Sequence, residues 1–171
     1  MIVAGHRASG SLDGGIDGSL GKAGLWAPGM IDLAPVLTVL CDQERERVQK
    51  RDQGRDSGLS GVAFYVVLQP LAVKAGVAVL VCLAVHELLS NACIHAFPAG
   101  TVGHVGVHLW RTCQPSPRAY LLVADDGCGF GAEPPSTAGS GLALARCFLE
   151  LADAQLAREP GRGTIWRIGL P

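Results

Sequence analysis

The sequence predicts an α/β fold, a two-layer α/β sandwich in which a mixed β-sheet is covered by helices on one face. Two observations predict it. A long apolar segment with helical period, Leu71–Phe97, follows a β-branched and aromatic segment, Gly61–Leu68. Downstream, two pairs of strand-like segments are each separated by a turn rich in Pro or Gly, which is typical of antiparallel hairpins.

The composition indicates one domain with an extension. Of the 171 residues, 49% are hydrophobic and 17% are charged, which is enough apolar material for a sizeable core. Residues 1–29 are rich in Gly, Ser and Asp without any period, so we expect a flexible leader there, followed by the domain at residues 30–171. A net charge of −1 gives no electrostatic basis for nucleic acid as a partner.

The cysteines and the apolar runs bear on the compartment. Six cysteines are scattered without a Cys-x-x-Cys pair, which favours a reduced, cytoplasmic protein. The longest apolar stretch, Ala75–Val85, has 11 residues, fewer than the ~20 that a membrane helix needs. We therefore expect no membrane segment in this chain.

The expected elements follow in chain order. Met30–Asp52 is expected to be a helix that Asp32 can cap, because an apolar stripe follows this Asp. Gly61–Leu68 is a strand, and the long helix Leu71–Phe97 ends at Pro98. The remaining elements are strands at Val105–Thr112 and Arg118–Asp125, a loop at Asp126–Gly139, a helix at Ser140–Leu151, and strands at Ala154–Arg158 and Thr164–Leu170.

A polar stripe lies on the long apolar helix. Glu87, Asn91 and His95 follow one another at intervals of four residues, so a carboxylate, a carboxamide and an imidazole project from one side. Leu88 and Ala92 belong to a neighbouring apolar stripe that can pack against a sheet. Taken alone, the polar stripe is compatible with a solvated helix face as well as with a binding site.

A second candidate is the segment Asp125-Asp126-Gly127-Cys128-Gly129, which leaves an apolar strand. A carboxylate at the strand end can accept a hydrogen bond from an exocyclic amine. Gly127 and Gly129 have no side chain, so a flat ring can approach the backbone there. The alternative is an ordinary Asp-Gly turn.

Two further glycine motifs come later. Gly139-Ser140-Gly141-Leu142 opens a helix, where free N–H groups suit phosphates, although Ser140 can also be a plain N-cap. Gly161-Arg162-Gly163-Thr164 closes the last hairpin, where a tight turn is the alternative to a ligand contact.

The order and spacing of these motifs resemble the GHKL ATPases. Glu-x-x-x-Asn on a helix, then Asp-x-Gly-x-Gly, Gly-x-Gly-Leu and Gly-x-Gly-Thr follow one another as in that family. The segment His86–Pro98 is similar to the N box of bacterial sensor histidine kinases, and the resemblance covers about Ile31–Pro171. It implies a Bergerat-type ATP-binding fold.

The resemblance also implies roles for single residues. Glu87 would be the catalytic or water-orienting carboxylate, Asn91 would help to hold Mg²⁺, and Asp125 would bind the adenine amine. The other residues implied at the ATP site are Gly127 and Gly129 beneath the adenine, Gly139, Ser140, Gly141 and Leu142 near the phosphates, and His95 and Thr164.

The sequence also departs from that family. Ile94 stands where such kinases usually carry Lys or Arg, the lid Phe130–Ala138 is short, and no clear F box is present. No phosphoacceptor histidine lies in a suitable helical segment. His104 and His108 have the spacing of a metal pair but are better interpreted as exposed residues on a strand.

The expected function is therefore the ATP-binding, catalytic domain of a two-component histidine kinase, with ATP and Mg²⁺ as its ligands. The acceptor histidine would lie on another segment or chain, so a phosphoacceptor domain or a response-regulator protein is the expected partner, and a homodimer is possible. The alternatives are a stand-alone GHKL serine kinase of the anti-sigma type and a phosphotransfer scaffold that has lost turnover.

Overall fold

The computed structural model describes residues 27–53, 61–98, 101–113, 118–129 and 141–171. The predicted leader at residues 1–29 lies almost wholly outside this range. The predicted lid and two candidate site residues, Gly139 and Ser140, also lie outside the described residues.

The described strands form a mixed sheet, as the sequence predicts. Five strands lie in the order β2-β4-β5-β7-β6, with β2 parallel to β4 and each other neighbouring pair antiparallel. The antiparallel pairs β4/β5 and β6/β7 are the two predicted hairpins. The bounds are β2 Gly61–Leu68, β4 Val102–Thr112, β5 Arg118–Asp125, β6 Gln155–Glu159 and β7 Thr164–Leu170.

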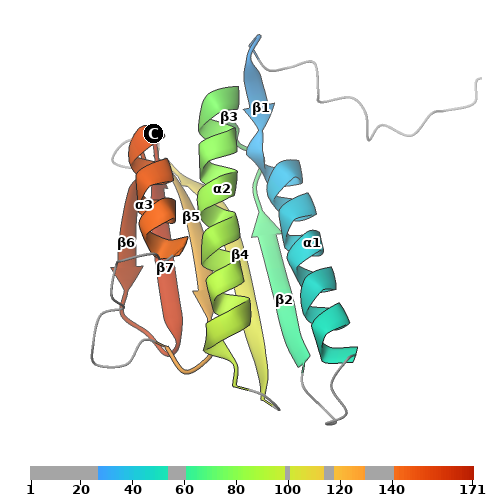
Figure 1. Cartoon of the computed structure of the whole chain (residues 1–171). Coiled ribbons are helices and arrows are strands. Elements are labelled where there is room, and N and C mark those ends of the chain that lie inside the picture. Colours follow the sequence, from blue (N-terminus) through green and yellow to red (C-terminus); the bar gives the residue numbers. More distant parts are fainter. Residues whose placement is uncertain (1–26, 54–60, 99–100, 114–117, 130–140) are drawn as a thin grey trace, which may run out of the picture.

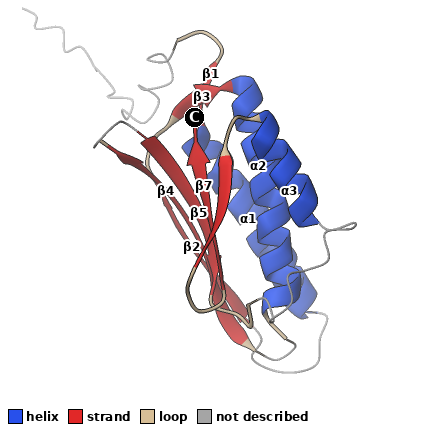
Figure 2. Ribbon diagram, turned by 90° about the vertical axis from the view of Figure 1, so that its left-hand side faces the viewer, coloured by secondary structure: helices blue, strands red, loops and turns tan. Residues whose placement is uncertain are grey.

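In the described part of the chain, three α-helices cover one face of this sheet, which confirms the two-layer sandwich (Figures 1 and 2). They are α1 Leu33–Gln53, α2 Ala75–Asn91 and α3 Gly141–Leu151. Side chains of α2 such as Val81 and Val85 are fully buried together with Leu121 of β5 and Ile168 of β7. The core is therefore the layer between α2 and the central strands.

Two short strands correct the predicted helix starts. Met30–Asp32 (β1) pairs with Ala72–Lys74 (β3), so the helices begin at Leu33 and Ala75 rather than at Met30 and Leu71. Asp32 Oδ1 accepts the N–H of Ala34 at 3.1 Å, which is the predicted cap, and also the N–H of Leu71 at 3.0 Å. This second bond holds the chain before β3 in place, a long-range contact that no local pattern indicates.

The end of the long helix also differs from the prediction of one α-helix through Phe97. After Asn91 the chain continues as a π-helix, η2 Ala92–Ala96. The carbonyl of Ala96 accepts the N–H of Cys128 at 2.9 Å, so the widened turn is joined to the loop that follows β5. Short π-helical segments are frequent at functional sites.

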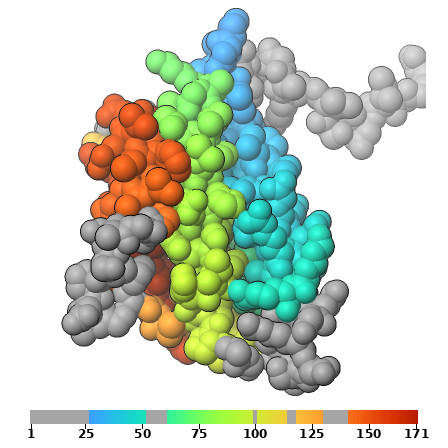
Figure 3. All heavy atoms as spheres, viewed as in Figure 1, coloured from blue at the N-terminus to red at the C-terminus, as the bar shows by residue number. Residues whose placement is uncertain are grey.

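Within the described residues, one helix, Ala75–Ala96, is long and apolar enough to span a membrane by length and composition. The prediction of no membrane segment rested on a shorter uninterrupted run. In the structure α2 is the central helix of its layer, between α1 and α3 (Figures 1 and 3). Its buried residues, among them Val81 and Val85, face the sandwich interior, whereas Val79 and Leu83 of the same helix are exposed.

Candidate functional site

A cavity of about 290 Å³ lies where the end of α2, η2 and α3 meet the ends of β5 and β7. Its wall is mostly apolar and carries a few polar groups, the usual make-up of a small-molecule site. The polar side chains are those of Asn91, His95, Asp125 and Thr164, and the remaining lining residues are Leu88, Ala92, Ala96, Gly129, Leu142 and Trp166.

Asp125 is the buried carboxylate of this cavity, with 7% of its surface exposed. Its Oδ1 accepts the N–H of Gly127 at 3.1 Å and that of Thr164 at 3.2 Å. Burial raises the pKa of the Asp125 carboxyl above its usual value, and these hydrogen bonds partly oppose the shift. Asp125 can accept a hydrogen bond from a donor inside the cavity.

The glycines around Asp125 allow close packing of backbone against backbone. A Cβ on Gly127 would overlap the carbonyl of Ala96 in η2, and Gly127 is not among the residues that line the cavity. Gly129 has a φ of +66° and lines the cavity, while a Cβ there would lie 2.9 Å from the Gly163 oxygen. The sequence predicts that a ligand ring approaches the backbone at Gly127. In the structure, the carbonyl of Ala96 approaches Gly127 closely.

Glu87 and Asn91 meet the start of α3. A Cβ on Gly141 would overlap Glu87 Oε2 and would lie 3.6 Å from Asn91 Nδ2. The first residue of α3 therefore packs directly on the stripe of α2, which leaves no room for a larger residue without displacing Glu87. Asn91 lines the cavity, and Glu87 lies beside it with 29% of its side chain exposed.

The structure brings most of the predicted site residues to one place. His95 is exposed on η2 and lines the cavity, and Leu142 is buried at the start of α3 and lines it too. Gly139 and Ser140 lie outside the described residues. The roles of all these residues in binding stay predictions.

Three apolar wall residues and one aromatic residue were not predicted as site residues. Leu88 and Ala92 were assigned to a stripe that packs against the sheet, but both also line the cavity. Trp166 is two residues after Thr164 on β7 and therefore shares its face. The alternation of side chains between the two faces of a strand could have marked Trp166 as a site residue, because Thr164 was already predicted. No local pattern marks Ala96.

The oxygen donors at this site suit a hard cation with few protein ligands. Among the described residues no group of three or more His, Cys, Asp or Glu side chains could hold a metal ion. Asn91 and the nearby Glu87 offer amide and carboxylate oxygens. This small set fits Mg²⁺, which takes one or two protein oxygens and completes its shell with phosphates and water.

The two strand histidines lie apart from the cavity lining, and both are exposed, as interpreted from the sequence. His104 Nδ1 lies 2.8 Å from Asp126 Oδ2, and the His108 ring is tilted against Trp110 with the ring centres 4.9 Å apart. Each histidine therefore has its own neighbour, which is Asp126 in the loop after β5 for His104 and Trp110 of β4 for His108.

Comparison with known proteins shows which folds this geometry resembles. No protein-family model matches the sequence, and no curated protein matches it either. Among solved structures, the histidine kinase domain of the Erythrobacter litoralis EL346 blue-light activated histidine kinase is similar, with a TM-score of 0.68 and 23% identity over 85% of this chain and 65% of that one. The mycobacterial sensor histidine kinase MprB gives a TM-score of 0.57 and 25% identity over 83% of this chain and 97% of that one.

The match to a second structure of the Erythrobacter litoralis kinase covers 82% of this chain and 42% of that one. The chain thus spans less than two thirds of the kinase chains that it matches first. Its fold is that of histidine kinase catalytic domains, and the resemblance to the GHKL-type ATPase domain is confirmed at the level of the fold.

Proposed function

We propose that this chain is the ATP-binding and catalytic domain of a histidine kinase, which transfers the γ-phosphoryl group of Mg-ATP to a histidine on another segment or chain. The observation that carries the proposal is the cavity. A buried carboxylate, Asp125, lies on its wall together with Asn91 of the N-box-like helix, in a fold shared with histidine kinase catalytic domains.

The adenine would bind between apolar walls and Asp125. Leu88, Ala92 and Trp166 provide apolar surface for a flat ring. Asp125 is held by two backbone N–H groups and would accept a hydrogen bond from the exocyclic amine. A guanine carries a carbonyl oxygen where adenine has this amine, and that oxygen would face the carboxylate.

The phosphates would extend toward the start of α3. Gly141 lets α3 begin against Glu87 and Asn91, so backbone N–H groups and oxygen ligands come together there. Asn91 would hold Mg²⁺, which neutralises phosphate charge when it is bound. Glu87 would orient the attacking group or accept its proton.

The acceptor would come from outside the described domain. The described histidines lie on a helix, on η2 or on a strand, and each has a fixed place in the fold. A phosphoacceptor histidine domain or a response-regulator protein is therefore the proposed partner, and a homodimer would supply the acceptor from a second copy.

Calorimetric titration with nucleotides tests the proposal. We expect Mg-ATP to bind with one site per chain, ATP without Mg²⁺ to bind more weakly, and Mg-GTP to bind far more weakly than Mg-ATP. Equal affinity for Mg-ATP and Mg-GTP would contradict the role of Asp125. Absence of binding by either nucleotide would contradict the proposed function as a whole.

A further inference from the structure

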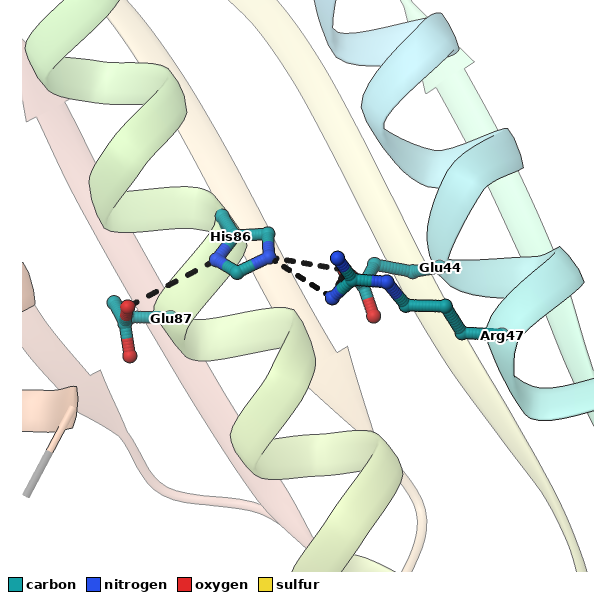
Figure 4. Close-up of polar contacts among 4 residues, drawn as sticks. All are labelled: Glu44, Arg47, His86 and Glu87. Atoms are coloured by element: carbon teal, nitrogen blue, oxygen red, sulfur yellow. Dashed lines mark hydrogen bonds and ion pairs between the residues drawn. The ribbon is translucent and has the colours of Figure 1, made fainter. Parts of the chain in front are cut away.

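A polar cluster joins α1 to the candidate catalytic residue on α2. Figure 4 shows Glu44 and Arg47 of α1 facing His86 of α2, which in turn neighbours Glu87. His86 Nε2 lies 3.2 Å from Glu44 Oε1, and His86 Nδ1 lies 3.8 Å from Glu87 Oε1. The imidazole therefore lies between two carboxylates, one on each helix.

Each ring nitrogen of His86 faces a carboxylate oxygen. When both ring nitrogens carry a proton, the imidazolium forms an ion pair with Glu44 through Nε2 and with Glu87 through Nδ1. Arg47 Nη1 donates to the same Glu44 oxygen at 3.1 Å and also lies 3.3 Å from His86 Nε2, which accepts a hydrogen bond from Arg47 when it carries no proton. The carboxylate of Glu44 is thus the common partner.

Glu44 is a rigid anchor for this arrangement. It is 3% exposed, whereas Arg47 is largely solvent-exposed. A buried carboxylate is costly unless it is paired, so Glu44 fixes the orientation of the groups that pair with it. His86, with 34% of its side chain exposed, has room to turn when its contact with Glu44 is removed.

Glu87 is contacted on two sides. Oε1 faces His86, and Oε2 lies against the place where a Cβ of Gly141 would be. If His86 turned away, one side of the carboxylate would lose its neighbour, and Glu87 could adopt other rotamers away from α3.

We propose that Glu44 and His86 are positioning residues, which hold the carboxylate of Glu87 at the phosphate end of the cavity. This inference rests on the proposed function. It makes α1 part of the catalytic apparatus, because the orientation of Glu87 depends on a carboxylate that α1 supplies. A displacement of α1 would then change turnover without changing the nucleotide pocket.

The test compares variants of the full chain in two measurements. The variants are Glu44→Gln, His86→Ala and the double variant, with Glu46→Gln as the matched control. Glu46 is an exposed carboxylate on the same helix whose described partner is Lys50 at 3.4 Å. The first measurement is the Kd for Mg-ATP by calorimetry. The second is the first-order rate at which bound, labelled ATP is hydrolysed to ADP and phosphate, with water as the acceptor of the γ-phosphoryl group.

We expect each single variant to keep the wild-type Kd and to form ADP more slowly, by on the order of 10- to 100-fold for a misplaced catalytic group. The double variant should be no slower than His86→Ala, because Glu44 acts through His86. Glu46→Gln should match the wild type. Thermal denaturation shows whether each variant is folded, and Glu44→Gln keeps the shape of the side chain at the buried position.

The outcomes separate this inference from the proposed function. Loss of nucleotide binding in the wild type contradicts the proposed function. If the wild type binds Mg-ATP, then unchanged rates in the single variants, multiplicative losses in the double variant, or no ADP formation by the wild type would each overturn the positioning role. If the wild type forms no ADP, there is no reaction step at Glu87 that Glu44 and His86 could support.

Discussion

Asp125 shows how one side chain can serve the fold and the site at once. Its Oδ1 accepts N–H groups from its own loop and from the start of β7, so it ties β5, the loop and the last hairpin together. Its burial raises the pKa of the carboxyl, because removing a charge from water disfavours the ionised form. A ligand amine would offset that cost.

Replacing Asp125 by Asn should weaken nucleotide binding and leave the fold intact. The amide oxygen can still accept both backbone N–H groups, but the charged partner of the adenine amine is lost. We expect a loss of about 1–3 kcal/mol in the binding free energy of Mg-ATP, measured by calorimetry. Asp126→Asn is the control, because Asp126 is bonded to His104 instead, and the same loss in both variants would contradict the assignment.

The raised pKa of Asp125 also predicts a pH dependence of stability. In the folded state the pKa of this carboxyl is raised, so its contribution to stability is fully present below its unfolded pKa and is lost as the pH rises through its folded pKa. Asp125→Asn lacks this loss. The melting temperature of Asp125→Asn minus that of the wild type should therefore be larger at about pH 7 than at about pH 3. A constant difference across that range would show that burial of the charge is not costly.

Asn91 predicts the metal dependence. It lines the cavity one helical turn after Glu87, where its amide oxygen can bind Mg²⁺. In Asn91→Ala, adding Mg²⁺ should no longer strengthen ATP binding, while the circular dichroism spectrum stays that of the wild type. The metal role would be wrong if EDTA and this substitution both left ATP affinity unchanged.

Among the elements, η2 decides where the loop after β5 lies. Ala96 accepts the N–H of Cys128, and its carbonyl occupies the space where a Cβ of Gly127 would be. Loop and helix end are thus in direct backbone contact beneath the cavity. The glycine at 127 is required by this contact.

Gly127→Ala should destabilise the protein because the added Cβ would overlap the Ala96 carbonyl, and backbone must move to relieve it. We expect a loss of about 1–3 kcal/mol in the free energy of unfolding, measured by urea denaturation. Gly76→Ala is the matched control, since nothing lies within 4 Å of a Cβ at that helical position. Its stability should stay the same or rise, because Ala favours helix over Gly. Equal stability of the two variants would show that the overlap is relieved without cost.

For the whole molecule, the separation of nucleotide site and acceptor is the main consequence of the fold. Phosphoryl transfer needs an acceptor imidazole in line with the γ-phosphate. His86 is held between two carboxylates, and His104 and His108 are fixed on β4. His95 lines the cavity from η2, which constrains it as an acceptor.

The purified chain should therefore bind ATP yet label itself on histidine slowly or not at all. The measurement is incubation with γ-labelled ATP followed by acid and base treatment, because phosphohistidine is acid-labile and phosphoserine survives acid. A partner that carries an acceptor histidine should restore acid-labile label. The fifth histidine of the chain, His6, lies outside the described residues. Strong acid-labile label on the isolated chain that disappears in His6→Ala would show that the N-terminal segment supplies an acceptor.

The elements could largely be predicted because each carries its own local pattern. The alternation in β5, the helical period of α2 and the turns of the two hairpins lie within short stretches of chain. The same local patterns placed Asp125 at a strand end and Asn91 on the stripe of Glu87. The misplaced helix starts came from β1 and β3, whose three-residue ladder joins segments about 40 residues apart.

Motif residues such as Asn91, Asp125 and Thr164 were therefore already marked in the sequence, because their spacing and neighbours are local properties of the chain. The cavity wall, the glycine contacts and the Glu44–His86–Glu87 arrangement depend on the packing of α1, α2 and α3 on one sheet. Ala96 and Glu44 each acquire their surroundings from elements remote in sequence. No periodicity encodes such neighbours, since they are fixed by the close packing of side chains between the two layers.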